Sequence, residues 1–194
     1  MATIDQIREL REQTGVSIIE CKKALEESNG DFEKAREILR KWGKELANKK
    51  SSREAKQGII EAYVHPNKKV GVLLDLHCET DFAKKSDDFS KLAHELCLHI
   101  AAMKPLFLSD ADIPENFLAG EKQIYSEQMK DSGKPENILN QIVEGKLKKY
   151  KEQVCLLEQF WIKDDQKTIR DLLNDYIAKL GENITIKSFT RYEV

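Results

Sequence analysis

The sequence predicts an α+β protein in which a small N-terminal bundle of three helices precedes a larger unit of strands and helices. Three observations predict this class. Residues 1–45 carry short apolar stripes at helical spacing. Residues 59–64 and 70–76 are apolar runs on either side of a Pro66-Asn67 turn, which is typical of a β-hairpin. Residues 184–189 alternate apolar and polar side chains, as a half-buried strand does.

Composition narrows the classes of function. The chain has 194 residues, of which 40% are hydrophobic and 34% charged, enough for one compact domain or a small and a larger one. Its 32 basic and 34 acidic residues nearly balance, which argues against nucleic-acid binding through bulk charge. The sequence contains neither a signal peptide nor a bilayer-spanning apolar run. We therefore expect a cytoplasmic protein that binds neither nucleic acid directly nor a membrane.

Each helix of the N-terminal bundle has its own start and stop signals. In chain order these are the capping-box pair Thr3 and Gln6, the terminator Gly15, the second capping-box pair Ser17 and Glu20, the terminator Asn29-Gly30 and the cap Asp31. Behind them the pattern dissolves into a polar stretch over residues 46–58, which we interpret as a linker, helical or loose. The expected units are thus residues 1–45, the linker 46–58, and residues 59–194.

The larger unit continues with helices separated by breakers. We expect a helix from about Asp88 to Pro105, one ending near Gly133, one opened by residues 134–137, and one over residues 168–180 capped by Gly181. Gly145 inside the third of these is interpreted as a mark of close packing. Residues 154–162 form an apolar run for which helix and strand both remain open.

The turn between the second hairpin strand and the next helix carries Thr80, Asp81 and Phe82. Two interpretations are open. In the first, Asp81 caps backbone amides and Phe82 staples the next helix, which is ordinary turn chemistry. In the second, a carboxylate and an aromatic ring form a rigid probe for a partner.

Enzyme and metal motifs are absent from the sequence. It contains no GxSxG, P-loop, HExxH or GxGxxG pattern. His65 and His77 lack neighbours at metal-ligand spacing, so we expect partly exposed strand histidines rather than a metal site. A nucleophile could be sought in two pairs, Cys78 with its neighbour His77, and Cys97 with His94 three positions before it on a helix. The first pair faces opposite sides of a strand, and the second lies where a helix needs an apolar residue. The four cysteines, Cys21, Cys78, Cys97 and Cys155, are expected to be buried and reduced.

Several stretches together resemble the elongation factor Ts family, in the family's order and over nearly the whole chain. They are Leu10-Arg11-Glu12-Gln13-Thr14-Gly15, residues 21–25 and 29–31, Glu79-Thr80-Asp81-Phe82, and residues 133–138, 142–145 and 181–191. The resemblance implies a ubiquitin-associated (UBA)-like module over residues 1–45. It also implies a core, residues 59–194, in which helices pack on a small antiparallel sheet.

The resemblance further implies a translation elongation factor without bond chemistry or a cofactor. Such a factor exchanges guanine nucleotide on elongation factor Tu: it binds the GDP form, disturbs its Mg²⁺ site and promotes GDP release. Thr80, Asp81, Phe82 and Ala83 match the segment that dislodges the ion, and Leu10, Arg11, Thr14 and Gly15 match the N-terminal docking motif. Short members with one core module are expected to form homodimers. The alternative from another class is a non-catalytic adaptor that uses its UBA-like module alone.

Three positions depart from the family pattern. Ala83 replaces a usual Val, which is expected to trim apolar contact beside Phe82. Gln159-Phe160-Trp161 replaces Gln-Pro-Phe and puts the local turn in doubt, and Lys187-Ser188 replaces a common Arg pair. None of the three changes Asp81 or Phe82.

Overall fold

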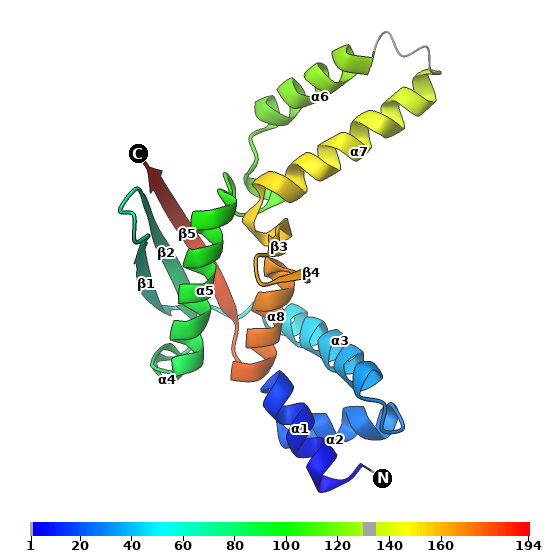
Figure 1. Ribbon diagram of the computed structural model, residues 1–194, viewed down its shortest axis with the longest axis vertical. Coiled ribbons are helices and arrows are strands. Elements are labelled where there is room, and N and C mark those ends of the chain that lie inside the picture. Colours follow the sequence, from blue (N-terminus) through cyan, green and yellow to red (C-terminus); the bar gives the residue numbers. More distant parts are fainter. Residues whose placement is uncertain (1, 130–134) are drawn as a thin grey trace.

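The computed structural model describes residues 2–129 and 135–194, and it confirms the α+β class (Figure 1). The helices are α1 (Ile4–Thr14), α2 (Ile18–Glu27), α3 (Phe32–Lys50), α4 (Asp81–Lys84), α5 (Asp87–Met103), α6 (Glu115–Met129), α7 (Glu136–Val154) and α8 (Ile169–Leu180). The strands are β1 (Gln57–Val64), β2 (Val70–Cys78), β3 (Phe160–Trp161), β4 (Asp164–Thr168) and β5 (Ile184–Glu193), and short 3₁₀ turns cover Asp110–Asp112 and Leu156–Glu158.

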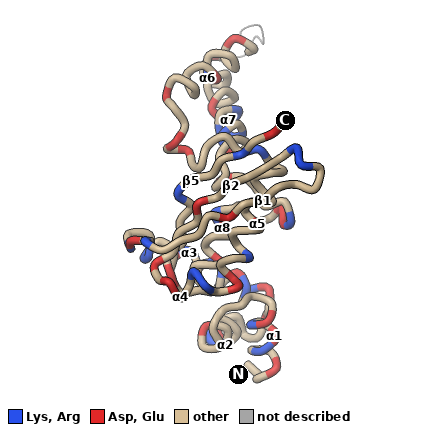
Figure 2. Tube along the Cα trace, turned by 90° about the vertical axis from the view of Figure 1, so that its left-hand side faces the viewer, with Lys and Arg blue, Asp and Glu red and all other residues tan. Residues whose placement is uncertain are grey.

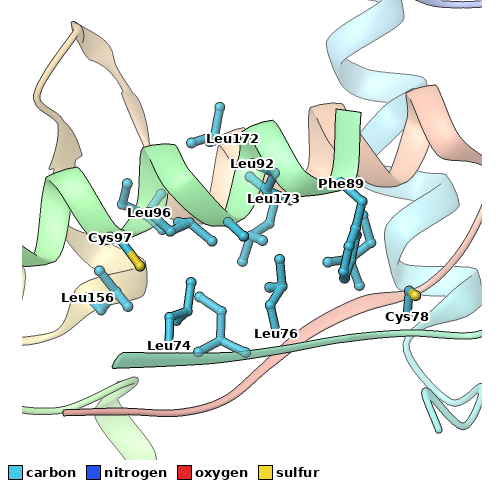
Figure 3. Close-up of a cluster of buried hydrophobic side chains, with 14 of the residues drawn as sticks. Leu74, Leu76, Cys78, Phe89, Leu92, Leu96, Cys97, Leu156, Leu172 and Leu173 are labelled. Carbon is cyan, nitrogen blue, oxygen red and sulfur yellow. The ribbon is translucent and has the colours of Figure 1, made fainter. Parts of the chain in front are cut away.

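The main sheet is antiparallel with strand order β1-β2-β5, and helices cover one of its faces. Leu74 and Leu76 of β2 point toward Phe89 and Leu92 of α5, while Leu173 of α8 closes the same cluster (Figure 3). These side chains are buried because alternate residues of a strand face one side, where the apolar stripe of each helix meets them. The opposite face of the sheet stays uncovered within the described chain.

The N-terminal bundle of α1, α2 and α3 has its own small core, built from the apolar stripes predicted from the sequence. The helix-start signals predicted for it are confirmed in part. Thr3 and Gln6 form the reciprocal capping box, and the Asp31 carboxylate accepts from two amides at the start of α3. Ser17 accepts from the amide of Glu20, but the Glu20 carboxylate binds the Ser17 hydroxyl instead of its backbone, so the second capping box is only half formed.

Helix α3 joins the bundle to the main core without a break. Its first half packs against α1 and α2, and its second half packs against α8, where Ala47 belongs to the main core. The expected boundary at residue 45 therefore lies inside a helix, and the first five residues of the expected linker are helical up to Lys50. Buried Lys50 reaches the carbonyl of Gly181, which ties the end of α3 to the end of α8.

Helices α6 and α7 form an antiparallel hairpin that projects away from the rest of the molecule (Figure 1). The end of α6 expected near Gly133 lies outside the described residues. Helix α7 starts after Pro135, as expected. A Cβ built on Gly145 would meet nothing within 4 Å, so the interpretation of this glycine as a close-packing site is wrong.

Residues 154–162, undecided from the sequence, contain the end of α7, a 3₁₀ turn and the start of a two-stranded hairpin, β3-β4, that the sequence analysis did not predict. Gln159 anchors this segment. Its Oε1 lies 2.9 Å from Nε2 of buried His99, and its Nε2 donates to the carbonyl of Gln153 at 2.6 Å. The buried amide thus holds the hairpin against α5, where the family pattern has a Pro in the following position.

Two further findings concern the chain as a whole. All four cysteines are free and buried, as expected. Among residues 2–129 and 135–194, no helix is both long and apolar enough to cross a membrane.

Candidate functional site

The segment between β2 and α5, residues 80–85, forms a short exposed tip at one end of the sheet, and α4 is its single helical turn. Thr80 is the N-cap of that turn, because its Oγ1 accepts from the amide of Ala83 at 3.2 Å. The sequence-based interpretation that gave the capping role to Asp81 is therefore wrong. Asp81 is the first helical residue, and its carboxylate turns toward solvent and two lysines.

Phe82 lies on the outer side of the tip. Its side chain is 87% exposed, whereas Phe89, at the start of α5, is 0% exposed and fills the core. The interpretation in which Phe82 staples the next helix is therefore wrong. An exposed ring on a short, capped turn is unusual, since burying a Phe side chain contributes about 1.5–3 kcal/mol. Phe82 does not contribute this free energy to the stability of the fold.

Ala83 points the other way, into the main core, and is 4% exposed. The replacement of Val by Ala at this position therefore alters packing beneath the tip. The expectation from the sequence, that this replacement trims apolar contact beside Phe82, is therefore wrong.

Asp81 adds a fixed negative charge next to the ring. Its two carboxylate oxygens lie 2.5 Å from the ammonium groups of Lys84 and Lys85. Hydrogen bonds from Lys84 and then Lys85 lower the pKa of Asp81 to about 2, so the carboxylate is ionised throughout the physiological range. The tip thus presents one ionised carboxylate and one apolar ring side by side.

Two residues that the sequence analysis did not assign to the site hold the tip from below. The Glu182 carboxylate accepts from the amide of Thr80 at 2.9 Å and from its hydroxyl at 2.5 Å. A second contact has its acceptor on the β2 side and its donor on the β5 side: the Glu79 carboxylate accepts from the amide of Asn183 at 2.6 Å. Glu182 lies in the family-like stretch over residues 181–191 and Glu79 in the stretch from Glu79 to Phe82, but nothing local indicated that the two stretches would be in contact.

The predicted docking motif on the N-terminal bundle is only partly accessible. Leu10 is 0% exposed and packs in the bundle core, so its side chain offers no surface to a partner. Arg11 is exposed, while Thr14 donates to the carbonyl of Leu10 at 2.7 Å. Gly15 adopts φ 70° and lies against the side chain of Lys179 on α8, so it belongs to the joint between bundle and core.

Ile18 and Ile19 form an exposed apolar pair beside Gly15 that the sequence analysis missed. They are the first two residues of α2, directly after its cap Ser17. The signal was present in the sequence. Both residues fall outside the apolar stripe that starts at Cys21, so a helix with this stripe inside must leave them outside.

The histidines and cysteines considered earlier form ordinary structural contacts. His77 lies 2.8 Å from a carboxylate oxygen of Asp75, and His94 lies 3.4 Å from one of Glu61. Burial raises the pKa of the Cys97 thiol to about 12, which rules out a reactive thiolate at neutral pH. Within the described residues, no group of three or more His, Cys, Asp or Glu side chains could hold a metal ion. Acidic and basic residues are interspersed along the chain (Figure 2).

Comparisons with known proteins agree with the resemblance. A family model described as elongation factor TS matches residues 4–194. The chain is 56% identical to elongation factor Ts of Thermotoga petrophila and 55% identical to that of Thermotoga maritima, in both cases over 99% of this chain and 96% of the relative. It is 46% identical to elongation factor Ts of a Thermoanaerobacter species over 100% of this chain and 95% of the relative.

Proposed function

The chain belongs to the elongation factor Ts family, and we propose that it is a guanine-nucleotide exchange factor for elongation factor Tu. It binds the GDP-loaded GTPase, disturbs the Mg²⁺ site and promotes GDP release. No covalent bond is made or broken. By linkage, the factor and the nucleotide must weaken each other's binding by the same factor.

The exposed tip carries this proposal. Magnesium in nucleotide sites of this kind bridges phosphate oxygens and protein ligands, so a shift of those ligands releases a major hold on the nucleotide. The ring of Phe82, 87% exposed, is available as an apolar wedge that a partner pocket can bury. The ionised Asp81 beside it is paired with Lys84 and Lys85, and its carboxylate can exchange these lysines for cationic and amide groups of the partner.

The tip alone does not supply enough free energy. A thousandfold loss of nucleotide affinity requires about 4 kcal/mol of coupling, whereas burying one Phe contributes about 1.5–3 kcal/mol. We propose that the N-terminal bundle supplies the remainder through Arg11, Ile18 and Ile19, which are exposed around the joint with α8. Leu10 supports this surface from inside the bundle.

We also propose that the protein is a homodimer that buries the uncovered face of the main sheet. Ile60, Leu73 and Tyr192 are 65%, 49% and 69% exposed, and they come from β1, β2 and β5 respectively. In the register Leu73 pairs with Thr190 and lies opposite Ala62, so these apolar and uncharged residues adjoin one another, and Asp75, opposite Ile60 and Ser188, adds one carboxylate to the same face. Leu73→Asp should leave a monomer in sedimentation equilibrium. A dimer of unchanged dissociation constant would reject this face.

Nucleotide dependence tests the proposed function against a passive adaptor. Nucleotide-free elongation factor Tu should bind the protein tightly in titration calorimetry, and added GDP should displace it. An adaptor would bind the GTPase with the same affinity whether or not GDP is present, and that result would overturn the proposal.

A further inference from the structure

We propose that Glu182 is a positioning residue for nucleotide exchange: its carboxylate locks the tip in the orientation in which Phe82 and Asp81 act. This inference rests on the proposed exchange activity and assigns a role to a residue that does not itself face the partner. Glu182 follows the end of α8 and is 102 positions from Thr80 in sequence.

Side-chain hydrogen bonds extend the pairing of β2 with β5 beyond the last backbone pair of the sheet. Cys78 and Ile184 are the last Cα partners of the β2–β5 ladder, and Glu79 with Asn183 and Thr80 with Glu182 are the next pairs in the same register. In these two pairs a side-chain carboxylate accepts the backbone amide opposite it, from Asn183 to Glu79 at 2.6 Å and from Thr80 to Glu182 at 2.9 Å. Charge-assisted bonds of this kind are stronger and shorter than neutral ones.

Asn183 and Arg53 make further contacts behind the Glu79–Asn183 pair. The Asn183 side chain donates to the carbonyl of Arg53 at 2.8 Å, and the Arg53 guanidinium lies 3.5 Å from the Glu79 carboxylate. Asn183 is buried, so these bonds are partly shielded from solvent. The segment before β1, the end of β2 and the start of β5 are thereby joined at the base of the tip.

Glu182 also sets the direction of the Thr80 hydroxyl. A hydroxyl has one proton, and here it is donated to Glu182 at 2.5 Å, which leaves a lone pair to accept the Ala83 amide at 3.2 Å. The carboxylate behind the cap therefore fixes the orientation of the hydroxyl that caps α4. A helix of four residues has no stability of its own, because nucleation costs more than one turn returns. Without Glu182, the turn that carries Phe82 loses its orientation.

The test measures release of a fluorescent GDP from elongation factor Tu as a function of factor concentration, for the wild type, Glu182→Ala, Glu182→Gln and Glu182→Asp. At saturating factor, we expect Glu182→Ala to slow release about tenfold, equivalent to about 1.4 kcal/mol at the barrier. The half-saturating concentration should change less than about twofold, because the N-terminal bundle still binds. Gln keeps one acceptor within reach and should recover part of the rate. Asp keeps the charge but is one methylene too short, so it should behave like Ala.

A double-mutant cycle separates positioning from a general structural role. In the Phe82→Ala background, Glu182→Ala should have a much smaller further effect, because the ring that Glu182 orients is gone and only Asp81 remains to be positioned. Equal slowing in both backgrounds, or an effect confined to the half-saturating concentration, would overturn the inference. Glu158→Ala, which removes a surface ion pair with Arg170, is the matched control and should release GDP at the wild-type rate.

The same experiment distinguishes the two proposals. Failure of the wild type to accelerate release would refute exchange activity itself. Acceleration that is lost in Phe82→Ala and unchanged in all three Glu182 variants would refute only the positioning role.

Discussion

Two phenylalanines seven residues apart should separate the stability of the protein from its proposed function. Phe89 is the third residue of α5 and lies in the main core, where it is 0% exposed. Phe82 lies on the tip and is 87% exposed. We expect substitution of each by Ala to give opposite pairs of results: loss of stability at one position, and loss of exchange at the other.

The magnitudes follow from burial. Truncating a fully buried Phe removes its transfer free energy and leaves a cavity, so Phe89→Ala should lower the free energy of unfolding by about 3–5 kcal/mol. That is a third or more of the stability of a typical domain, which is about 5–15 kcal/mol. Phe82 loses little contact on truncation, so Phe82→Ala should change the free energy of unfolding by less than about 0.5 kcal/mol.

Urea denaturation followed by circular dichroism measures both changes. Phe160→Ala is an internal standard, because its side chain is 51% exposed and should fall between the two. The slope of free energy against urea should stay constant across the three variants, so that the midpoints report stability. A loss above about 1 kcal/mol for Phe82→Ala, or below that value for Phe89→Ala, would refute the burial argument.

Two further predictions concern glycine conformation and pH. Gly15→Ala should destabilise the protein by about 1–2 kcal/mol, because residue 15 has positive φ. Gly145→Ala, in open helical space, should stabilise it by about 0.5–1 kcal/mol. A raised thermal midpoint for Gly15→Ala would contradict the first prediction, and a lowered midpoint for Gly145→Ala would contradict the second. Burial lowers the pKa of His99 below 6.5, so the unfolded chain takes up a proton first and stability should fall as pH drops below about 6.5. His99→Gln should flatten this dependence between pH 7.5 and 5.5, and an unchanged slope in denaturation midpoints would exclude His99 as its source.

The sequence predicted well what is decided by neighbours along the chain. Thr3, Gly15 and Asp31 act as caps and terminators because their contacts lie within four residues. The pairing of β1 with β2 follows from the short turn between them. Long-range contacts were not predictable. The β3–β4 hairpin depends on the Gln159–His99 bond across 60 positions.

The tip shows the same limit. Spacing pointed to Asp81 as the cap, whereas the structure has Thr80 in that role, with its hydroxyl donating to Glu182, which is distant in sequence. Exposure of Phe82 likewise follows from the fact that Phe89 already occupies the core beneath α5. The family resemblance identified the segment, and the three-dimensional arrangement identified which of its side chains is free to meet a partner.

The most direct test of the account is the rate of GDP release at saturating factor. Stopped-flow measurement should show Phe82→Ala and Asp81→Ala releasing fluorescent GDP from elongation factor Tu much more slowly than the wild type, while both variants unfold at the wild-type urea midpoint. Release at the wild-type rate by both variants would contradict the central role given to the exposed ring and its carboxylate neighbour.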